Sequence, residues 1–359
     1  MRKYYLDNIR WGTICLVVVY HVVYIFNGVA VDGVLGPFAQ PQYQDALQYL
    51  LYPWFMVLLF IVAGMCSRYY LETHTLGEFI RSRTRKLLVP STIGLLAVGW
   101  VQGYVSMAIS DAFHTIPDTV PGIAMYLIMV LSGTGVLWFA QMLWVFSMLL
   151  AAVKHFETGR LYGFTRGANM AVLVLLAVPV YLSGLILNTP VICVYRFGIY
   201  GFTFFLGYFL FAHDEVIDRL SRYAPPLLAA AAVLGAVYLL LHFGDNYAVM
   251  PVVNCVPAAA YAWAACLTAL GGMKRWGDTR TKFSAFMSKR SFGLYVLHYL
   301  PLSASAYALR QYTALSALPC YLITAFAAFV GSLILYEIIL RTPFLRWCVL
   351  GLRKEKHHV

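Results

Sequence analysis

The sequence predicts an all-α, polytopic membrane protein, a bundle of about ten transmembrane helices with both termini in the cytoplasm. Of its 359 residues, 61% are hydrophobic and only 11% are charged, whereas soluble domains carry roughly 25% charged residues. Apolar stretches recur along the whole chain, and most have the ~20 residues that a helix needs to cross a ~30 Å hydrocarbon core. This composition excludes a soluble globular enzyme.

Ten apolar stretches are the expected spans. They lie near residues 11–30, 50–67, 88–110, 136–153, 168–187, 197–212, 224–243, 251–271, 291–311 and 319–340. A further apolar stretch, Ile123 to Leu131, precedes the fourth span, and the sixth span is short for a crossing. No linker rich in proline or serine and no low-complexity run divides the chain, so we expect a single transmembrane domain over residues 1–359.

The positions of lysine and arginine predict the orientation. With the N-terminus inside, all 26 of them except Arg196 and Arg310 fall in segments expected to be cytoplasmic. Cytoplasmic connections of membrane proteins are enriched in these residues, so an even number of spans with both ends inside is favoured. The cytoplasmic segments include a basic loop at residues 68–87 and a tail at residues 341–359.

The net charge of +11 follows from this topology. The basic residues are distributed over separate cytoplasmic segments, so we do not expect nucleic-acid binding. The seven cysteines have neither CxxC nor metal-ligand spacing and are expected to be small apolar fillers. No phosphate-binding glycine loop, dinucleotide fingerprint, GxSxG elbow or metal-ligand cluster is recognisable, so neither a metal nor a permanently bound cofactor is expected.

An arginine and a histidine on the first span are the most informative residues. Arg10 and His21 are eleven residues apart, which is roughly 1100° of helical rotation, so both side chains would lie on one helix face. The same spacing is about 16 Å of rise, which places Arg10 at the membrane edge and His21 near the middle of the bilayer. Asp7 precedes Arg10 by three residues and can pair with it.

An ionisable side chain at that depth is costly, and it indicates function unless it faces a packed protein interior. We therefore predict that His21 is catalytic. Arg10, at the membrane edge on the same helix face, is the second residue of the predicted catalytic pair, and Asp7 supports it. The alternative is structural: Asp7 would cap the helix, Arg10 would anchor it at the cytoplasmic surface, and His21 would be a packed polar residue.

A run of cations precedes the third span. Four of them fall within six residues on the expected cytoplasmic side: Arg81, Arg83, Arg85 and Lys86. Such a cluster can bind the phosphates of a soluble ligand or of lipid headgroups, or can simply anchor the span.

Two further residues belong to the candidate set. His298 is expected about 10 Å deep in the ninth span, where it could line the same cavity as His21 or could pack against a neighbouring helix. Glu337 and Arg341 are four residues apart near the inner end of the last span, and we expect a structural ion pair between them. His242 is expected near the outer face, where nothing singles it out.

Several segments together resemble one known family. Asp7-x-x-Arg10, followed by ten residues and His21, is similar to the Arg-x10-His signature of the acyltransferase-3 family, whose members are multi-span bacterial membrane enzymes that O-acylate sugars. Other segments similar to that family follow in order and reach nearly the whole chain: Trp54 to Gly64, Phe79 to Pro90, Trp138-Phe139 with Leu143, Ser291 to His298, and Tyr336-Glu337 through Phe344.

Two positions depart from the family pattern. Ala63 stands where serine is usual, so any hydroxyl role at that position is absent. Lys86 stands where the basic segment usually has a second arginine, and lysine binds phosphate as a point charge without the bidentate fork of arginine.

The resemblance implies an integral membrane O-acyltransferase of the plasma (inner) membrane. It would move an acetyl group from acetyl-CoA to a hydroxyl of a sugar or glycan, either lipid-linked or extracytoplasmic, and membrane lipids would be its other partners. Coenzyme A phosphates would bind residues Arg81 to Lys86, with Arg10 at the entrance. His21 would act as general base on the acceptor hydroxyl or would carry the acyl group covalently.

Two other functions remain open on the sequence alone. A proton-coupled transporter of a small or lipid-linked solute could use His21 and His298 as a proton relay. A non-catalytic partner in a glycan-assembly complex would need neither histidine.

Overall fold

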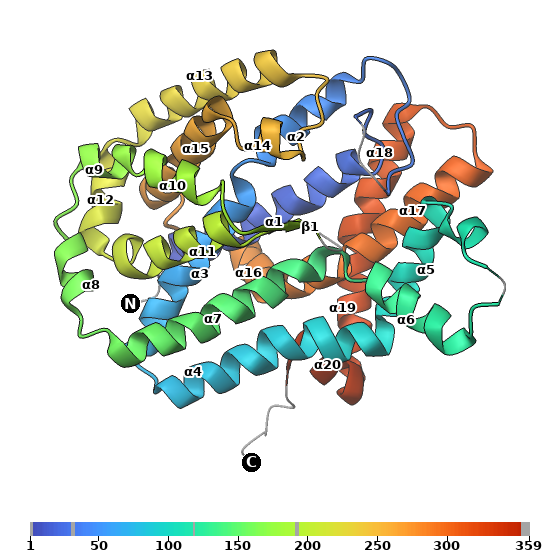
Figure 1. Cartoon of the computed structure of the whole chain (residues 1–359), viewed down its shortest axis with the longest axis horizontal. Coiled ribbons are helices and arrows are strands. Elements are labelled where there is room, and N and C mark those ends of the chain that lie inside the picture. Colours follow the sequence, from blue (N-terminus) through green and yellow to red (C-terminus); the bar gives the residue numbers. More distant parts are fainter. Residues whose placement is uncertain (1–2, 30–32, 118, 191–193, 353–359) are drawn as a thin grey trace. The chain divides into compact units, whose positions relative to one another are not determined.

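The computed structural model describes residues 3–29, 33–117, 119–190 and 194–352 (Figure 1). Within this part, almost all regular structure is helical, apart from one antiparallel pair of short strands, β1 (Asn188–Pro190) and β2 (Val194–Arg196), which pairs Thr189 with Tyr195. The chain is an all-α polytopic membrane protein, as its composition predicted.

The helices of the first half, in chain order, include short 3₁₀ and π segments. They are α1 (Tyr4–Tyr24), η1 (Tyr43–Asp45), α2 (Ala46–Leu51), α3 (Phe55–Leu71), α4 (Leu76–Arg83), η2 (Thr84–Leu88), η3 (Pro90–Gly99), α5 (Trp100–Ile109), η4 (Ala112–Thr115), α6 (Gly122–Ser132), η5 (Gly135–Leu137), α7 (Trp138–Phe156), α8 (Arg160–Thr165), α9 (Met170–Leu175) and α10 (Ala177–Ser183).

The remaining helices follow the two strands. They are α11 (Phe197–Leu206), η6 (Gly207–Phe211), α12 (Asp214–Arg222), α13 (Ala224–His242), α14 (Met250–Val253), α15 (Val256–Trp276), α16 (Lys282–Leu297), α17 (Tyr299–Tyr312), α18 (Ala317–Phe326), η7 (Ala327–Gly331), α19 (Ser332–Arg341) and α20 (Pro343–Leu350).

Seven continuous helical segments of the described chain are long and apolar enough to cross a membrane. They are Tyr4–Tyr24, Tyr43–Leu71, Leu76–Ile109, Gly135–Phe156, Ala224–His242, Val256–Trp276 and Ala317–Arg341. Shorter apolar helices cover the fifth and sixth expected spans, Met170–Ser183 and Phe197–Phe211. The ninth expected span is divided between α16 and α17. The count of ten spans and the cytoplasmic position of both ends stay predictions.

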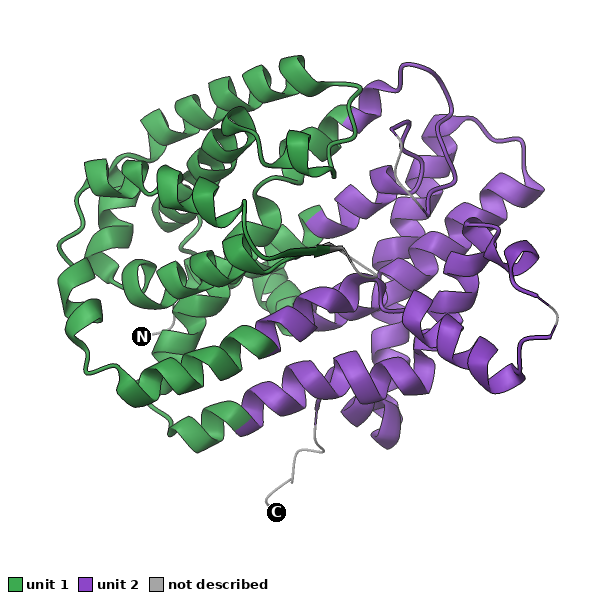
Figure 2. Cartoon of the chain, viewed as in Figure 1, with its two compact units in different colours: residues 1–16, 46–80, 145–289 green, residues 17–45, 81–144, 290–359 purple. Residues whose placement is uncertain are grey.

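The chain divides into two compact units, and each is built from three separate stretches of sequence (Figure 2). Unit 1 comprises residues 1–16, 46–80 and 145–289, and unit 2 comprises residues 17–45, 81–144 and 290–359. The chain therefore enters each unit several times, and the expectation of a single domain over residues 1–359 stays a prediction.

Small residues let the helices of unit 1 approach closely. A Cβ atom added to Gly64 on α3 would collide with the backbone carbonyl oxygen of Phe204 on α11, and one added to Gly207 would collide with the carbonyl of Ile61. The hydrophobic effect does not drive helices together within lipid, so their association depends largely on close van der Waals packing of this kind. In the same unit α13 packs against α15 (Figure 1).

The segment expected as a basic loop at residues 68–87 is mostly helical, and its cytoplasmic position stays a prediction. Arg68 lies in the last turn of α3, and after a short connection the chain is helical from Leu76 to Ile109. Pro90 lies inside this helix as the first residue of the π-helical segment η3, and Val89 separates it from the end of η2 at Leu88. Proline has no backbone N–H to donate, and its ring crowds the preceding turn of an α-helix. The wider π turn leaves room for the ring, so the helix continues past Pro90.

The tail expected at residues 341–359 begins with a packed helix in unit 2. Cys348, Val349 and Leu350 of α20 are buried against a cluster that includes Leu297 and Tyr336. A Cβ atom on Gly94 of η3 would collide with the carbonyl of Cys348, so α20 lies directly on the helix that carries the basic residues. The last seven tail residues, 353–359, lie outside the described part.

The glycine contact in unit 1 gives a stability prediction. Replacing Gly64 with Ala should lower the free energy of unfolding by about 1–3 kcal/mol, because the new methyl group meets backbone that cannot move aside. Replacing Gly77 with Ala is the matched control, since a Cβ atom there meets nothing within 4 Å. Thermal unfolding of both variants in detergent tests this, and equal midpoints would show that the α3–α11 contact is not tight.

Candidate functional site

Two histidines meet in unit 2. His21 lies in the last turn of α1, and His298 lies at the junction where α16 ends and α17 begins. The Nε2 atom of His298 is 3.1 Å from Nδ1 of His21, and the ring centroids are 5.1 Å apart. The two rings are in contact although 277 positions separate them in the sequence, and the expectation that they line one cavity stays a prediction.

Backbone carbonyl oxygens set the proton positions in this pair. A carbonyl only accepts a hydrogen bond, so Nδ1 of His298, 2.9 Å from the carbonyl oxygen of Tyr295, carries a proton. The same holds for Nδ1 of His21, which is 2.9 Å from the carbonyl oxygen of Val17. In the neutral pair, Nε2 of His298 is then an acceptor and faces the Nδ1–H of His21.

These proton positions leave Nε2 of His21 as the available acceptor of the pair. Both nitrogens of His298 are engaged, and so is Nδ1 of His21. Within the described residues no hydrogen bond reaches Nε2 of His21, so its lone pair is available. His21 can therefore act as a base or a nucleophile, whereas His298 fixes the tautomer and orientation of His21.

Aromatic rings surround His21. The ring centroids of Tyr20 and Tyr299 lie 5.1 Å and 5.2 Å from that of His21, both edge-on. His298 is completely buried, while His21 is partly exposed. Tyr299 also lines a cavity of about 80 Å³, together with Gln102 and Thr134. Tyr299 therefore both lines this cavity and contacts the ring of His21.

Arg10 and Asp7 form the ion pair that their spacing predicted. In unit 1, Nη2 of Arg10 donates to Oδ1 of Asp7 at 2.8 Å. Asp7 also lines an open polar cavity of about 800 Å³ within unit 1, beside Tyr69, Tyr162 and Arg166. The structure confirms the helix that carries Arg10 and His21, and their catalytic roles stay predictions.

The four expected donor-binding cations lie in unit 2 on the helical run from α4 into η2. Arg81 and Lys86 are exposed, and Arg83 and Arg85 are half-buried. The Nε atom of Arg85 is buried and has no hydrogen-bond partner among the described residues. A buried donor without a partner is costly in a folded protein, so this atom is suited to receive an oxygen from a bound anion.

The ion pair expected between Glu337 and Arg341 is not formed. Oε1 of Glu337 instead accepts hydrogen bonds from Arg290 of α16, at 2.8 Å from Nη2 and 3.3 Å from Nε. Arg341 is the exposed last residue of α19. Two nitrogens of the Arg290 guanidinium therefore donate to one carboxylate oxygen of Glu337.

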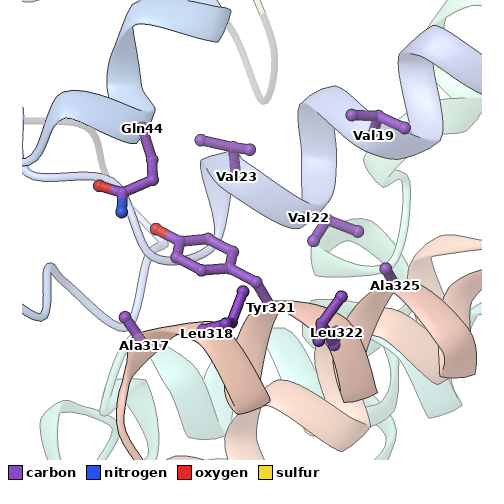
Figure 3. Close-up of a pocket in the computed structure, with 9 residues that line it drawn as sticks. All are labelled: Val19, Val22, Val23, Gln44, Ala317, Leu318, Tyr321, Leu322 and Ala325. Carbon is purple, nitrogen blue, oxygen red and sulfur yellow. The ribbon is translucent and has the colours of Figure 1, made fainter.

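A second cavity in unit 2 is apolar. It measures about 400 Å³ and lies between α1 and α18, where Val19, Val22 and Val23 face Tyr321 and Leu322 (Figure 3). The three valines are roughly 100–200° around the helix from His21, so they point away from the histidine pair. The apolar cavity and the His21 side chain thus lie on different faces of the same part of α1.

Sequence reasoning missed two residues of the site. Tyr299 directly follows His298, so its contact with His21 could have been inferred once the two histidines were paired. Arg290 directly precedes the segment Ser291 to His298 and binds Glu337, 47 residues further along the chain. No local spacing rule reports a contact of that range.

Comparison with known proteins decides the family. The family model described as an acyltransferase domain, that of the acyltransferase-3 family, matches residues 3–337. The chain belongs to the acyltransferase-3 family. The matched region runs from the start of α1 to Glu337 and contains all the candidate residues. The chain is therefore a multi-pass membrane acyltransferase. No curated protein and no solved structure matches it.

The corrected ion pair gives a second prediction. Replacing Glu337 with Gln should lower the free energy of unfolding by about 1 kcal/mol or less, because both partners are partly exposed to solvent. Replacing Arg290 with Gln should cost the same and should add nothing in the double variant. Arg341→Gln is the matched control, and thermal unfolding is the measurement. A loss of stability in Arg341→Gln alone would restore the pairing expected from the sequence.

Proposed function

We propose that this acyltransferase moves an acetyl group from acetyl-CoA to a hydroxyl group of a sugar or glycan. One observation carries the proposal: Nε2 of His21 has a free lone pair, while His298 and the carbonyl of Val17 hold the other nitrogen of the ring. Acyl transfer to a hydroxyl needs a group that takes the hydroxyl proton or receives the acyl group. His21 is placed to do either.

In the first route His21 is a general base. Its Nε2 takes the proton of the acceptor hydroxyl while the oxygen attacks the thioester carbon. The new C–O bond forms, the C–S bond breaks, and the departing thiolate takes the proton back from Nε2. His298 holds the ring in the tautomer that keeps Nε2 unprotonated at the start.

In the second route His21 is a covalent carrier. Its Nε2 attacks the thioester carbon, the C–S bond breaks, and an acyl-imidazole forms with release of the thiolate. The acceptor hydroxyl then attacks this carbon, loses its proton, and regenerates the imidazole. Trapping an acyl group on His21 would distinguish this route from the first.

The donor site is proposed on the basic helix of unit 2. Coenzyme A carries several phosphate charges, and Arg81, Arg83, Arg85 and Lys86 supply cations in the same unit as His21. The unpartnered Nε of Arg85 supports this assignment more than charge alone does, because anchoring a helix needs no buried donor. Arg10 at the donor entrance follows from the family resemblance.

The acceptor and the membrane are proposed from the family. A sugar hydroxyl on a lipid-linked or extracytoplasmic glycan, modified at the plasma (inner) membrane, fits the resemblance, and no residue described above selects one sugar.

The histidine pair argues against the proton-coupled transporter. A relay must take up a proton at one end and release it at the other. Here Nδ1 of His298, the nitrogen that does not face His21, donates to the backbone carbonyl oxygens of Leu294 and Tyr295. A proton on that atom has only backbone carbonyls to go to, so the pair orients one base rather than conducting protons.

The role of His21 can be tested directly. His21→Ala in purified protein in lipid should bind acetyl-CoA but lose acetyl transfer by about 100-fold or more, as expected for removal of a general base. His155→Ala, an exposed histidine on α7, is the matched control and should retain activity. Measured turnover close to wild type in His21→Ala would remove this residue from the mechanism.

The donor site has its own test. Arg83→Ala with Arg85→Ala should raise the KM for acetyl-CoA about tenfold and leave kcat nearly unchanged, since these residues would bind phosphate and not the reacting atoms. Arg160→Ala with Arg222→Ala removes two exposed cations elsewhere and is the charge-matched control. An unchanged KM would return the basic helix to an anchoring role.

A further inference from the structure

A cysteine, a histidine and an aspartate lie in line in unit 1. The Sγ atom of Cys255 is 3.4 Å from Nε2 of His242, and Nδ1 of the same ring is 3.2 Å from Oδ2 of Asp245. His242 is the last residue of α13, Asp245 lies in the following connection, and Cys255 immediately precedes α15. The distribution of lysine and arginine predicts that this connection is extracytoplasmic.

The order of the three groups is that of a nucleophile, a base and an orienting acid. The carboxylate of Asp245 accepts from Nδ1–H, which leaves Nε2 of His242 unprotonated on the side of Cys255. The thiol can donate either to this Nε2, at 3.4 Å, or to the backbone carbonyl oxygen of Val252, at 3.3 Å. The thiol and the carboxylate contact opposite nitrogens of the ring, so they do not converge on a point where a metal ion could bind. The arrangement fits acyl transfer and does not fit metal binding.

Cys255 stands at the N-terminus of α15, a helix of 21 residues. The first backbone N–H groups of a helix have no intrahelical partner, and in α15 they belong to Val256 and Ala258, because Pro257 has none. These groups can bind the oxyanion that forms when a carbonyl is attacked. Cys255 is partly exposed, so a substrate can reach it, whereas Cys266 and Cys348 are buried.

A tyrosine fixes the connection that carries the carboxylate. Tyr49 donates its hydroxyl hydrogen to the backbone carbonyl of Asp245 and accepts a hydrogen bond from the backbone N–H of Gly244 at 3.1 Å. The ring centroid of Tyr238 lies 5.4 Å from that of His242. Groups held by such neighbours keep the geometry that catalysis requires. Cys255 therefore departs from the expectation that the cysteines are apolar fillers.

We propose that Cys255, His242 and Asp245 form a second acyl-transfer site that accepts an acyl group from an activated ester or thioester. His242 takes the proton from Cys255, the sulfur attacks the carbonyl carbon, and a C–S bond forms. The bond to the leaving alkoxide or thiolate breaks, and that group takes the proton from His242. A hydroxyl or water then attacks the acyl-cysteine, gives its proton to His242, and releases Cys255 as the thiolate, which recovers that proton.

This site does not depend on His21, and the experiment keeps the two apart. The full chain, purified in lipid, is mixed with p-nitrophenyl acetate, and p-nitrophenolate release is followed while peptide mass spectrometry locates the acetyl group. Wild type and His21→Ala should both give a burst and a hydroxylamine-sensitive acetyl group on Cys255. Cys255→Ala should give neither, and Cys15→Ala, a partly exposed cysteine on α1, is the matched control.

A second measurement tests the base without requiring an acyl-enzyme. Alkylation of Cys255 by iodoacetamide near pH 7 should be at least tenfold slower in His242→Gln than in wild type, and Asp245→Asn should be intermediate. Equal alkylation rates in wild type and His242→Gln would overturn the proposal. So would an acetyl group found elsewhere on the chain and absent from Cys255.

Discussion

The hydrogen bond between His298 and His21 is the constraint on which the reactive site depends. An imidazole in a membrane-spanning helix is costly unless each polar atom is satisfied. Backbone carbonyls of α1 and α16 accept the two Nδ1 protons, and the break between α16 and α17 places His298 at a helix junction. The carbonyls also fix the tautomers, so the bonds that satisfy both Nδ1 atoms and Nε2 of His298 leave the lone pair on Nε2 of His21 available.

The sequence predicted those parts of the site that follow from regular helical geometry. A period of 3.6 residues placed Arg10 and His21 on one face, and the Asp7–Arg10 pair follows from a spacing of three. The basic segment is mostly helical because the helix that begins at Leu76 continues through Pro90 in π turns, which the sequence alone does not indicate. The Arg290–Glu337 pair was missed because only tertiary structure brings residues 47 apart together.

The Cys255 cluster shows a different limit of sequence reasoning. Its three residues fall at the end of one helix, in a turn and at the start of the next helix, so no helical or strand period relates them. Their spacing, three residues and then ten, matches no fixed motif, and acid–base–nucleophile groups are recognised by geometry and not by order in the chain. The connection must fold before the sulfur and the imidazole meet.

His21 and His242 are oriented by different groups, and each group suits the surroundings of its histidine. His21 lies in an apolar span, and neutral carbonyls hold its Nδ1, so no second charge is buried with it. The carboxylate of Asp245, which accepts from Nδ1 of His242, is 57% exposed and remains hydrated. A hydrated carboxylate can orient an imidazole near the surface without burying a charge, whereas a neutral carbonyl can orient one inside an apolar span. The group that orients each histidine therefore follows from how far its surroundings exclude water.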